Sequence, residues 1–351
     1  MNTTVTTANF YFNDQTRSIT DCIKNMKTLL QIPCNLVIYC NNPLYQGIKE
    51  IRDEANLSEK TVYNVMDFSS IWSYQFRDKI NENRKIYWPT RDPRAGVESH
   101  IITNNKFDFV LSTINTNPFK TTKFAWLDAN IGVNGSKIAK NFTNEKFINL
   151  LDQVGPKFHI QILGVVDKKY VQEQFLKEYY SRYQWIVCGC LFTLENNGKN
   201  KTILNRMKEI FVETVNHGYG HAEEMHYLKL LDEFYDDIDK GYGDYSDILE
   251  NFIVPRGNLN YVLYNIIAKY FQFGYYRECY DACKAFSKNL NDEYFEFFIF
   301  YYYSTLMFIG KNEARKILFN FLPKIYSKPY FEQKYLENQN YCNQIFTLVF
   351  N

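Results

Sequence analysis

The chain has 351 residues, of which 46% are hydrophobic and 23% are charged, and these values exclude a wholly disordered protein. Forty basic and 39 acidic side chains leave a formal charge of +1, so no overall field would attract nucleic acid or an anionic membrane. No stretch reaches the about 18 uninterrupted apolar residues of a membrane helix, and residues 1–5 lack the features of a secretory signal peptide. We therefore expect a globular protein with no nucleic-acid partner and no membrane span.

In chain order, the first 165 residues alternate short apolar or β-branched runs with segments of helical spacing. Continuous apolar runs such as residues 34–39 are typical of strands that are buried on both faces. The alternation predicts an α/β sandwich in which helices cover a mostly parallel sheet. Strands are predicted at residues 3–12, 34–39, 59–67, 123–127, 158–165 and 185–193, and helices at 21–31, 78–82, 107–113, 144–154 and 169–183.

Further along, residues 202–215 and 222–235 have helical periodicity, whereas the acidic segment 236–247 predicts a surface loop. Pro255-Arg256-Gly257 then marks a boundary, so we predict a domain at 1–254 and an all-α domain at 255–351. The second domain is expected to contain two helical hairpins (259–272 with 277–290, and 295–309 with 313–321) and a terminal helix at 331–350.

The turns of these two hairpins have a spacing that resembles a known repeat. Gly274 and Gly310 lie 36 residues apart, close to the about 34-residue period of tetratricopeptide (TPR) repeats. A TPR-like solenoid and a non-repeat helical bundle both remain open. Either arrangement offers helices for a protein partner or for self-association.

Eight cysteines are scattered through apolar runs without Cys-x-x-Cys spacing. We interpret them as buried free thiols, which persist in a reducing compartment, and this predicts a cytoplasmic location. Cys188 and Cys190 lie two residues apart in a predicted strand, but no other Cys or His has suitable local spacing. Core packing is therefore favoured over a metal pair.

The most informative stretch is the apolar strand at 123–127, which leads directly into Asp128-Ala129-Asn130. In open α/β sheets the ligand site lies beyond the carboxyl ends of the strands, so Asp128 and Asn130 are expected to face a substrate. Two oxygen ligands one residue apart suit a hard divalent cation such as Mg²⁺. The alternative is an Asx-turn, in which these side chains bond the backbone two residues on.

Three motifs occur in a fixed order and together resemble a known family: Ile32-Pro33-Cys34-Asn35-Leu36-Val37-Ile38-Tyr39, Asn117-Pro118-Phe119, and Phe124-Ala125-Trp126-Leu127-Asp128-Ala129-Asn130-Ile131-Gly132. They resemble the HtrL/YibB-like family, which is similar to GT-A glycosyltransferases. Those enzymes transfer a sugar from a nucleotide-sugar donor and use Mn²⁺ or Mg²⁺ at an Asp-x-Asp-type motif. The resemblance covers the part of the chain before the predicted helical domain.

The resemblance implies a GT-A-like, Rossmann-type fold over residues 1–254 and a glycosyltransferase activity. A UDP-sugar is the expected donor, and a glycan or a protein is the expected acceptor. Asn130 stands where GT-A enzymes generally have Asp, and no clean Trp-Asn-x-Lys segment precedes the Asn-Pro-Phe motif. The need for Mn²⁺ or Mg²⁺ therefore stays open.

The same resemblance implies donor contacts elsewhere in the chain. Thr6, Thr7 and Ala8 would face the nucleotide at the end of the first strand, although an ordinary strand end is the alternative. Arg77 and Lys79 would contact the donor phosphates, although basic residues are usually solvated surface. Gly189 would allow the close approach of a substrate backbone or sugar ring.

Residues 217–226 hold three of the five histidines. His221 and His226 lie five residues apart rather than the four of a His-Glu-x-x-His zinc site, so a zinc protease is a poor interpretation. Under the GT-A resemblance, His221 would complete the metal site with Asp128 and Asn130. Glu224, rather than Glu223, would deprotonate the acceptor hydroxyl. The alternative is that these acidic residues only stabilise the start of a helix.

The leading hypothesis is thus a metal-assisted glycosyltransferase with a helical C-terminal domain. One competitor is a non-catalytic interaction protein that has a degenerate GT-A domain and a helical partner-binding module. The other is a metal-dependent hydrolase of nucleotide-sugars or phosphate esters.

Overall fold

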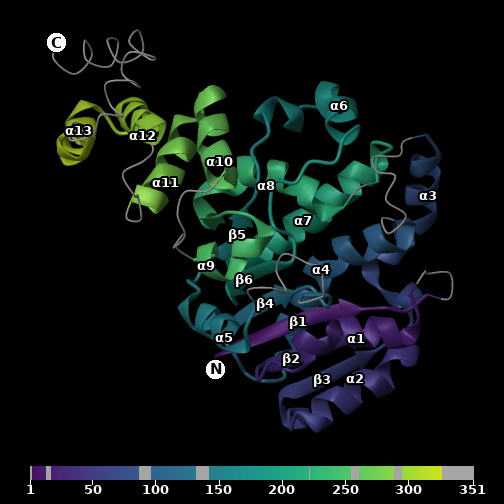
Figure 1. Ribbon diagram of the computed structural model, residues 1–351. Helices are drawn as coiled ribbons and strands as arrows, with labels where there is room; N and C mark the ends of the chain where they lie inside the picture. Colours follow the sequence, from purple (N-terminus) through teal and green to yellow (C-terminus); the bar gives the residue numbers. More distant parts are fainter. Residues whose placement is uncertain are drawn as a thin grey trace. The chain divides into compact units, whose positions relative to one another are not determined.

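The computed structural model describes residues 2–12, 17–86, 96–131, 142–220, 222–253, 261–287 and 295–325. The chain divides into two compact units, Met1–Ile253 and Val254–Asn351. The first unit contains a seven-stranded sheet with helices, and the described part of the second unit is helical (Figure 1). The functional roles assigned to residues 1–254 and 255–351 stay predictions.

The sheet has the strand order β3-β2-β1-β4-β6-β5-β7. Strands β1 to β4 are parallel, β5 and β7 are parallel to each other, and only β6 runs antiparallel to both of its neighbours. The predicted α/β fold with a mostly parallel sheet is therefore confirmed. The strands are β1 (Thr3–Asn9), β2 (Asn35–Cys40), β3 (Thr61–Val65), β4 (Lys123–Leu127), β5 (Phe158–Ile162), β6 (Leu191–Glu195) and β7 (Ile238–Tyr242).

Helices cover both faces of this sheet (Figure 1). Apolar side chains of α1, α2 and α5, such as Met26, Ile48 and Leu151, share one core cluster with Val5 and other strand residues. On the opposite face, α4 packs against β1 and β4 and also against α7. The helices of the first unit are α1 (Ile19–Leu30), α2 (Asn42–Glu54), α3 (Arg77–Ile86), α4 (Val97–Thr116), α5 (Asn144–Gln153), α6 (Leu176–Tyr180), α7 (Gly198–Asn216), α8 (Tyr227–Phe234) and α9 (Ile248–Asn251).

Aromatic packing fixes α4 on the sheet. Phe109 of α4 stacks on Trp126 of β4 with ring centroids 6.3 Å apart, and its ring lies 4.4 Å from that of Tyr39 in β2. Phe109 is thereby placed over the carboxyl-terminal halves of β2 and β4. Residues on the same helix face as Phe109 consequently reach the edge at which those strands end.

Three sequence-based predictions of secondary structure are wrong. The predicted helix at 169–183 breaks into the 3-10 turns η5 (Lys168–Val171) and η6 (Glu173–Phe175) and the short α6. The predicted strand at 185–193 begins only at Leu191, although Val187 makes an isolated bridge to Ile162. The predicted surface loop at 236–247 contains β7, which pairs with β5. Ile238 and Tyr242 at the two ends of β7 are buried, although the residues between them are mostly polar.

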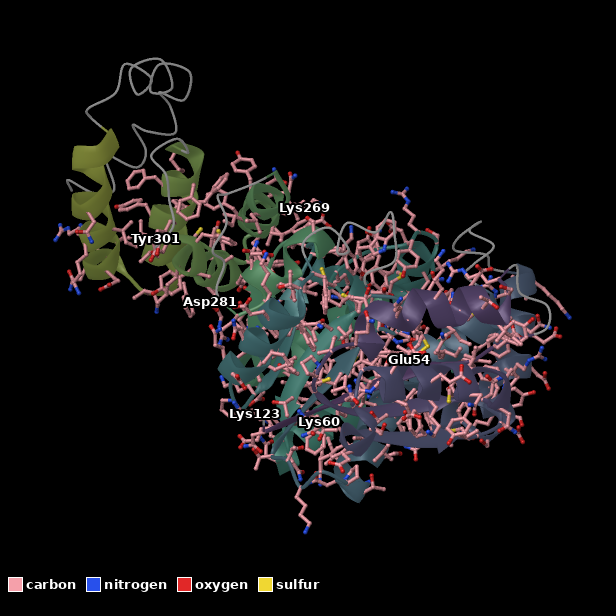
Figure 2. All side chains as sticks on the ribbon, turned by 60° about the horizontal axis from the view of Figure 1, so that its bottom comes forward. Glu54, Lys60, Lys123, Lys269, Asp281 and Tyr301 are labelled. Carbon is pink, nitrogen blue, oxygen red and sulfur yellow. The ribbon has the colours of Figure 1, made fainter. Side chains whose placement is uncertain are left out.

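The second unit is built from α10 (Tyr261–Gln272), α11 (Tyr276–Phe286), α12 (Phe295–Phe308) and α13 (Lys311–Ile325). Gly274 and Gly310 follow α10 and α12 with φ of +73° and +123°, values that favour glycine at a helix end. The ring of Tyr301 on α12, labelled in Figure 2 near Asp281 of α11, lies 5.9 Å from that of Tyr280. The predicted helices are confirmed, whereas the TPR-like repeat stays a prediction and the terminal helix at 331–350 lies outside the described residues.

Two further expectations can be compared with the structure. All seven described cysteines are free and buried, which confirms the interpretation of buried thiols, and Cys342 lies outside the described residues. Within the described ranges, no helix combines the length and the apolar character needed to cross a membrane.

Candidate functional site

The candidate site lies at the carboxyl ends of the central strands. The chain leaves β1 toward β2 on one side, and β4 lies on the other side of β1, so the strand order reverses at β1. Ligands of open α/β sheets bind in the crevice at such a reversal. Asp128 follows the last residue of β4 at this edge. Lys60 and Lys123, labelled in Figure 2, mark the opposite edge, because they lie at the amino ends of β3 and β4.

Lys106 of α4 lies at the centre of the site and is only 3% exposed. Its Nζ donates to the carbonyl oxygen of Gly189 at 2.9 Å and forms an ion pair with Asp128 Oδ1 at 3.1 Å. It also donates to Glu223 Oε1 in a short hydrogen bond. The ammonium thus has two hydrogen bonds and a further ion pair, which hold it from three sides.

Asp128 is held from a second direction. The indole Nε1 of Trp126 donates to Asp128 Oδ1 at 2.7 Å, and the Asp128 side chain is 38% exposed. Its backbone carbonyl accepts from Ile131 N at 3.1 Å, so residues 128–131 form a backbone turn. The carboxylate therefore faces Lys106 and Trp126 instead of serving only as a local turn former.

The two glutamates come from the 3-10 turn η7 (Glu223–His226), which precedes α8. Glu223 is 1% exposed, and its Oε2 has no hydrogen-bond partner among the described residues. Glu224 is partly exposed, and its Oε2 accepts from the hydroxyl of Tyr183 at 2.8 Å. The adjacent carboxylates thus differ, because Glu223 is enclosed by the protein whereas Glu224 can reach a bound molecule.

Gly189 makes room for both glutamates. A Cβ atom built at this position would lie 2.7 Å from Glu223 Oε1 and 3.1 Å from Glu224 Cγ. Gly189 is thus closely approached by these two side chains, whereas the expected approach of a substrate backbone or sugar ring stays a prediction. Its carbonyl oxygen at the same time binds Lys106.

Burial and charge shift the pKa values of these groups. Burial raises the pKa of the Glu223 carboxyl well above its usual range, and the neighbouring Glu224 raises it further, although Lys106 acts in the opposite direction. Burial lowers the pKa of Lys106, but the carboxylates of Asp128, Glu223 and Glu224 together raise it well above its usual value. Burial, followed by the charge of Glu224, raises the pKa of the Tyr183 hydroxyl. Lys106 is therefore a charged ammonium inside the protein.

The predicted donor contacts lie in other surroundings. Thr6 and Thr7 are fully buried within β1, and Ala8 is 6% exposed. The Oγ1 atoms of both threonines lack hydrogen-bond partners among the described residues. Lys79 is exposed on α3.

Arg77 is bound to the beginning of α4. Its guanidinium forms an ion pair with Glu98 at 3.0 Å. Glu98 precedes Lys106 by about 12 Å along the helix axis. The structure therefore brings Asp128, Gly189, Glu223 and Glu224 together and places Arg77 outside this group.

The residues predicted to bind a metal ion do not form a free ligand set. Asn130 is exposed, and His221 lies outside the described residues. Asp128 Oδ1 is already bound by Lys106 and Trp126. Among the residues that the structure describes, no group of three or more His, Cys, Asp or Glu is arranged to hold a metal ion. Asp128 Oδ1 is therefore taken by Lys106 and Trp126 instead of being free for Mn²⁺ or Mg²⁺, and the ligand roles of Asn130 and His221 stay predictions.

Sequence reasoning missed Lys106, Trp126 and Tyr183. A signal for Lys106 was present, because it shares the spacing i, i+3, i+4, i+7 with Phe109, Val110 and Thr113, which are all buried. A lysine on an apolar helix face must find an acceptor inside the protein. No comparable signal distinguishes Tyr183 among 29 tyrosines.

Comparison with known proteins gives matches to solved structures and to one protein family. Among solved structures, the chain has a distant similarity to the "crystal structure of mouse Xyloside xylosyltransferase 1, apo form", with 10% identity and a TM-score of 0.38, over 72% of this chain and 94% of that chain. No curated protein matches the chain. Residues 4–152 match the family described as "Bacterial protein of unknown function (HtrL_YibB)". The predicted resemblance to this family is therefore confirmed over residues 4–152.

Proposed function

We propose that the protein is a glycosyltransferase that moves a sugar from a nucleotide-sugar donor to an acceptor hydroxyl. The observation that carries the proposal is the ionic cluster of the buried Lys106 and Glu223 with the partly exposed Asp128 and Glu224 at the carboxyl-terminal edge of the sheet. Titratable groups with strongly shifted pKa values, gathered at such an edge, are typical of active sites. The motifs shared with the HtrL/YibB-like family, and through it the resemblance to GT-A enzymes, select sugar transfer among the possible reactions.

In the proposed reaction, the bond between the anomeric carbon and the diphosphate oxygen of the donor breaks. A bond from the acceptor oxygen to that carbon forms, and the hydroxyl proton passes to a base. Glu224 is the proposed base, because it is partly exposed and Tyr183 orients its carboxylate. Glu223 is a poorer candidate, since it is enclosed and paired with Lys106.

Several finer predictions belong to this proposal. A UDP-sugar is the proposed donor, and a glycan or a protein is the proposed acceptor. The predicted donor contacts are unchanged and comprise Thr6, Thr7, Ala8, Arg77 and Lys79. The cytoplasmic location and the partner-binding role of the helical unit also stay predictions. No step is routed through Mn²⁺ or Mg²⁺, because Asp128 already pairs with Lys106.

A non-catalytic role is the second candidate. It is favoured by one observation, namely that all three partners of the Lys106 ammonium belong to the protein itself. Buried ion pairs of this kind also occur in purely structural positions. A scaffold of this sort would bind no donor at this edge, whereas the enzyme would.

Donor hydrolysis tests the proposal without knowledge of the acceptor, because water can replace the acceptor hydroxyl. We expect the purified chain to release nucleoside diphosphate from one of a UDP-, GDP- and CMP-sugar panel, or nucleoside monophosphate in the CMP case. Glu224→Gln should lower the rate by about 10²-fold or more, since general-base catalysis contributes about 10²–10⁴-fold.

Glu209→Gln is the matched control, because Glu209 is an exposed glutamate of α7. It should hydrolyse the donor at the wild-type rate. If the Glu224 variant retained that rate on a hydrolysed donor, the assignment of the base would be wrong. If no donor bound at all, the scaffold would be the better description.

A further inference from the structure

We propose that the ammonium of Lys106 is a built-in cation of this site, which holds Asp128 and Glu223 in the place that a divalent metal ion would otherwise take. Lys106 is thereby a positioning residue. The inference stands on the geometry of the cluster alone. Its consequence for catalysis, that sugar transfer needs no added divalent metal, rests on the proposed function.

The atoms that surround Lys106 Nζ are oxygens, which are the ligands that hard cations bind. Two carboxylate oxygens and one backbone carbonyl oxygen surround it. Oxygen-only sets of this type bind Mg²⁺, Ca²⁺ and similar ions. The hydrogen bond of 2.9 Å to Gly189 O and the ion pair of 3.1 Å to Asp128 Oδ1 are both longer than metal–oxygen distances of about 2.0–2.6 Å.

The three acceptors arrive from separate parts of the chain. Asp128 follows β4, Gly189 precedes β6, and Glu223 lies in η7, while Lys106 itself belongs to α4. A single positive charge therefore joins four segments at the edge of the sheet. Bound metal ions join protein segments in the same manner. The Lys106 ammonium and a divalent metal ion are therefore alternatives for the position between Asp128, Gly189 and Glu223.

Electrostatics makes the two cations exclusive. Lys106 is buried, and its ammonium lies directly against the carboxylates of Asp128 and Glu223. A divalent ion bound to Asp128 Oδ1 would come within a few ångströms of the ammonium, in a region where screening by water is weak. The metal would therefore have to displace the ammonium and leave a buried lysine without a partner, which is strongly unfavourable.

Gly189 indicates that the position is tightly built. A Cβ there would lie 2.7 Å from Glu223 Oε1, so the carboxylate fills the space next to the glycine. Trp126 Nε1 also binds the same Asp128 oxygen as Lys106 does. The carboxylates thus have defined positions without any further ion.

The test measures Mn²⁺ binding and thermal unfolding of the full chain in EDTA and in MnCl₂. The wild-type protein should unfold at the same temperature in both solutions and should bind no Mn²⁺ at this site. Lys106→Met removes the ammonium and leaves an oxygen-lined, negatively charged position. It should unfold at a lower temperature in EDTA and should regain several degrees in MnCl₂, together with stoichiometric Mn²⁺ binding.

Two control variants accompany this test. Lys106→Met with Glu223→Gln removes one positive and one negative charge, so its Mn²⁺ affinity should be at least tenfold below that of Lys106→Met. Lys208→Met removes another lysine that pairs with a carboxylate of α4, Asp108, and should gain no Mn²⁺ binding.

Two results would overturn the inference. One is wild-type protein that binds a single Mn²⁺ which Asp128→Asn abolishes. The other is a folded Lys106→Met protein that binds no Mn²⁺. If Lys106→Met does not fold, the Mn²⁺ titration of the wild type with its Asp128→Asn control decides alone. Mn²⁺ binding by the wild type that Asp128→Asn abolishes overturns the inference, and no Mn²⁺ binding by the wild type supports it.

Discussion

Gly189→Ala is the substitution whose effect follows most directly from the coordinates. The added Cβ would lie 2.7 Å from Glu223 Oε1, 3.1 Å from Glu224 Cγ and 3.2 Å from Glu224 Oε1. Side-chain ends can often move away from such a contact. Here Glu223 cannot do so freely, because it is 1% exposed and bound to Lys106. The substitution must therefore distort the ionic cluster or shift the backbone at residue 189.

Overpacking of a closely packed interior costs about 1–3 kcal/mol. For a unit of the size of Met1–Ile253, each kcal/mol corresponds to about 2–4 °C in the unfolding temperature, so a decrease of about 2–12 °C is expected. Gly198→Ala is the matched control. A Cβ at Gly198 meets nothing within 4 Å, and the residue begins α7 after the N-cap Asn197. Alanine there should leave stability unchanged or raise it by up to about 1 kcal/mol.

Thermal unfolding followed by circular dichroism compares the two variants with the wild type. The prediction requires a decrease for Gly189→Ala and none for Gly198→Ala. If Gly189→Ala unfolded at the wild-type temperature, Glu223 would be free to move, and the description of a rigid cluster would be wrong. A crystal structure of the variant would then show where the carboxylate goes.

Further predictions concern buried polar groups elsewhere in the first unit. Arg52 is fully buried and donates to backbone carbonyls of Leu30, Ile32 and Cys34, so Arg52→Met should cost at least about 3 kcal/mol in urea unfolding; a loss below 1 kcal/mol would contradict this. Burial lowers the pKa of His226 to about 3, so from about pH 6.5 downward the unfolded chain binds a proton that the folded chain excludes. His226 should therefore contribute up to about 1.4 kcal/mol per pH unit to the fall in the free energy of unfolding, and His226→Phe should reduce the slope by that amount without weakening the protein at pH 7; an unchanged slope would contradict the assignment.

The sheet was largely predictable because its central strands are continuous apolar runs. Residues 123–127 were predicted as a strand and form β4 with the same bounds. In contrast, β7 was taken for a loop, since Asp239, Lys240 and Gly241 interrupt its apolar residues. Gly241 is needed there, because a Cβ would lie 2.3 Å from the carbonyl oxygen of Phe252. Such a tertiary requirement leaves no periodic pattern in the sequence.

The candidate site was predictable only in part. Asp128 was predictable because it directly follows a strand. Glu223 and Glu224 were predictable because they follow a glycine-containing loop at the start of a helix. Their common partner Lys106 was missed, because lysine is normally a surface residue and its role depends on how α4 lies across β4. Arg77 was selected for its charge, but Glu98, which neutralises that charge, lies 21 positions along the chain.

Calorimetric titration of a UDP-sugar into wild-type protein and Asp128→Asn tests the central claim most directly, namely that the Lys106 cluster is where a nucleotide-sugar binds. Asparagine preserves the shape of the side chain but removes the charge that faces Lys106. With both proteins shown to be folded by their unfolding transitions, we predict that the wild type binds the donor and that Asp128→Asn binds it at least tenfold more weakly. Equal affinities, or no binding of any nucleotide-sugar to the wild type, would contradict the account.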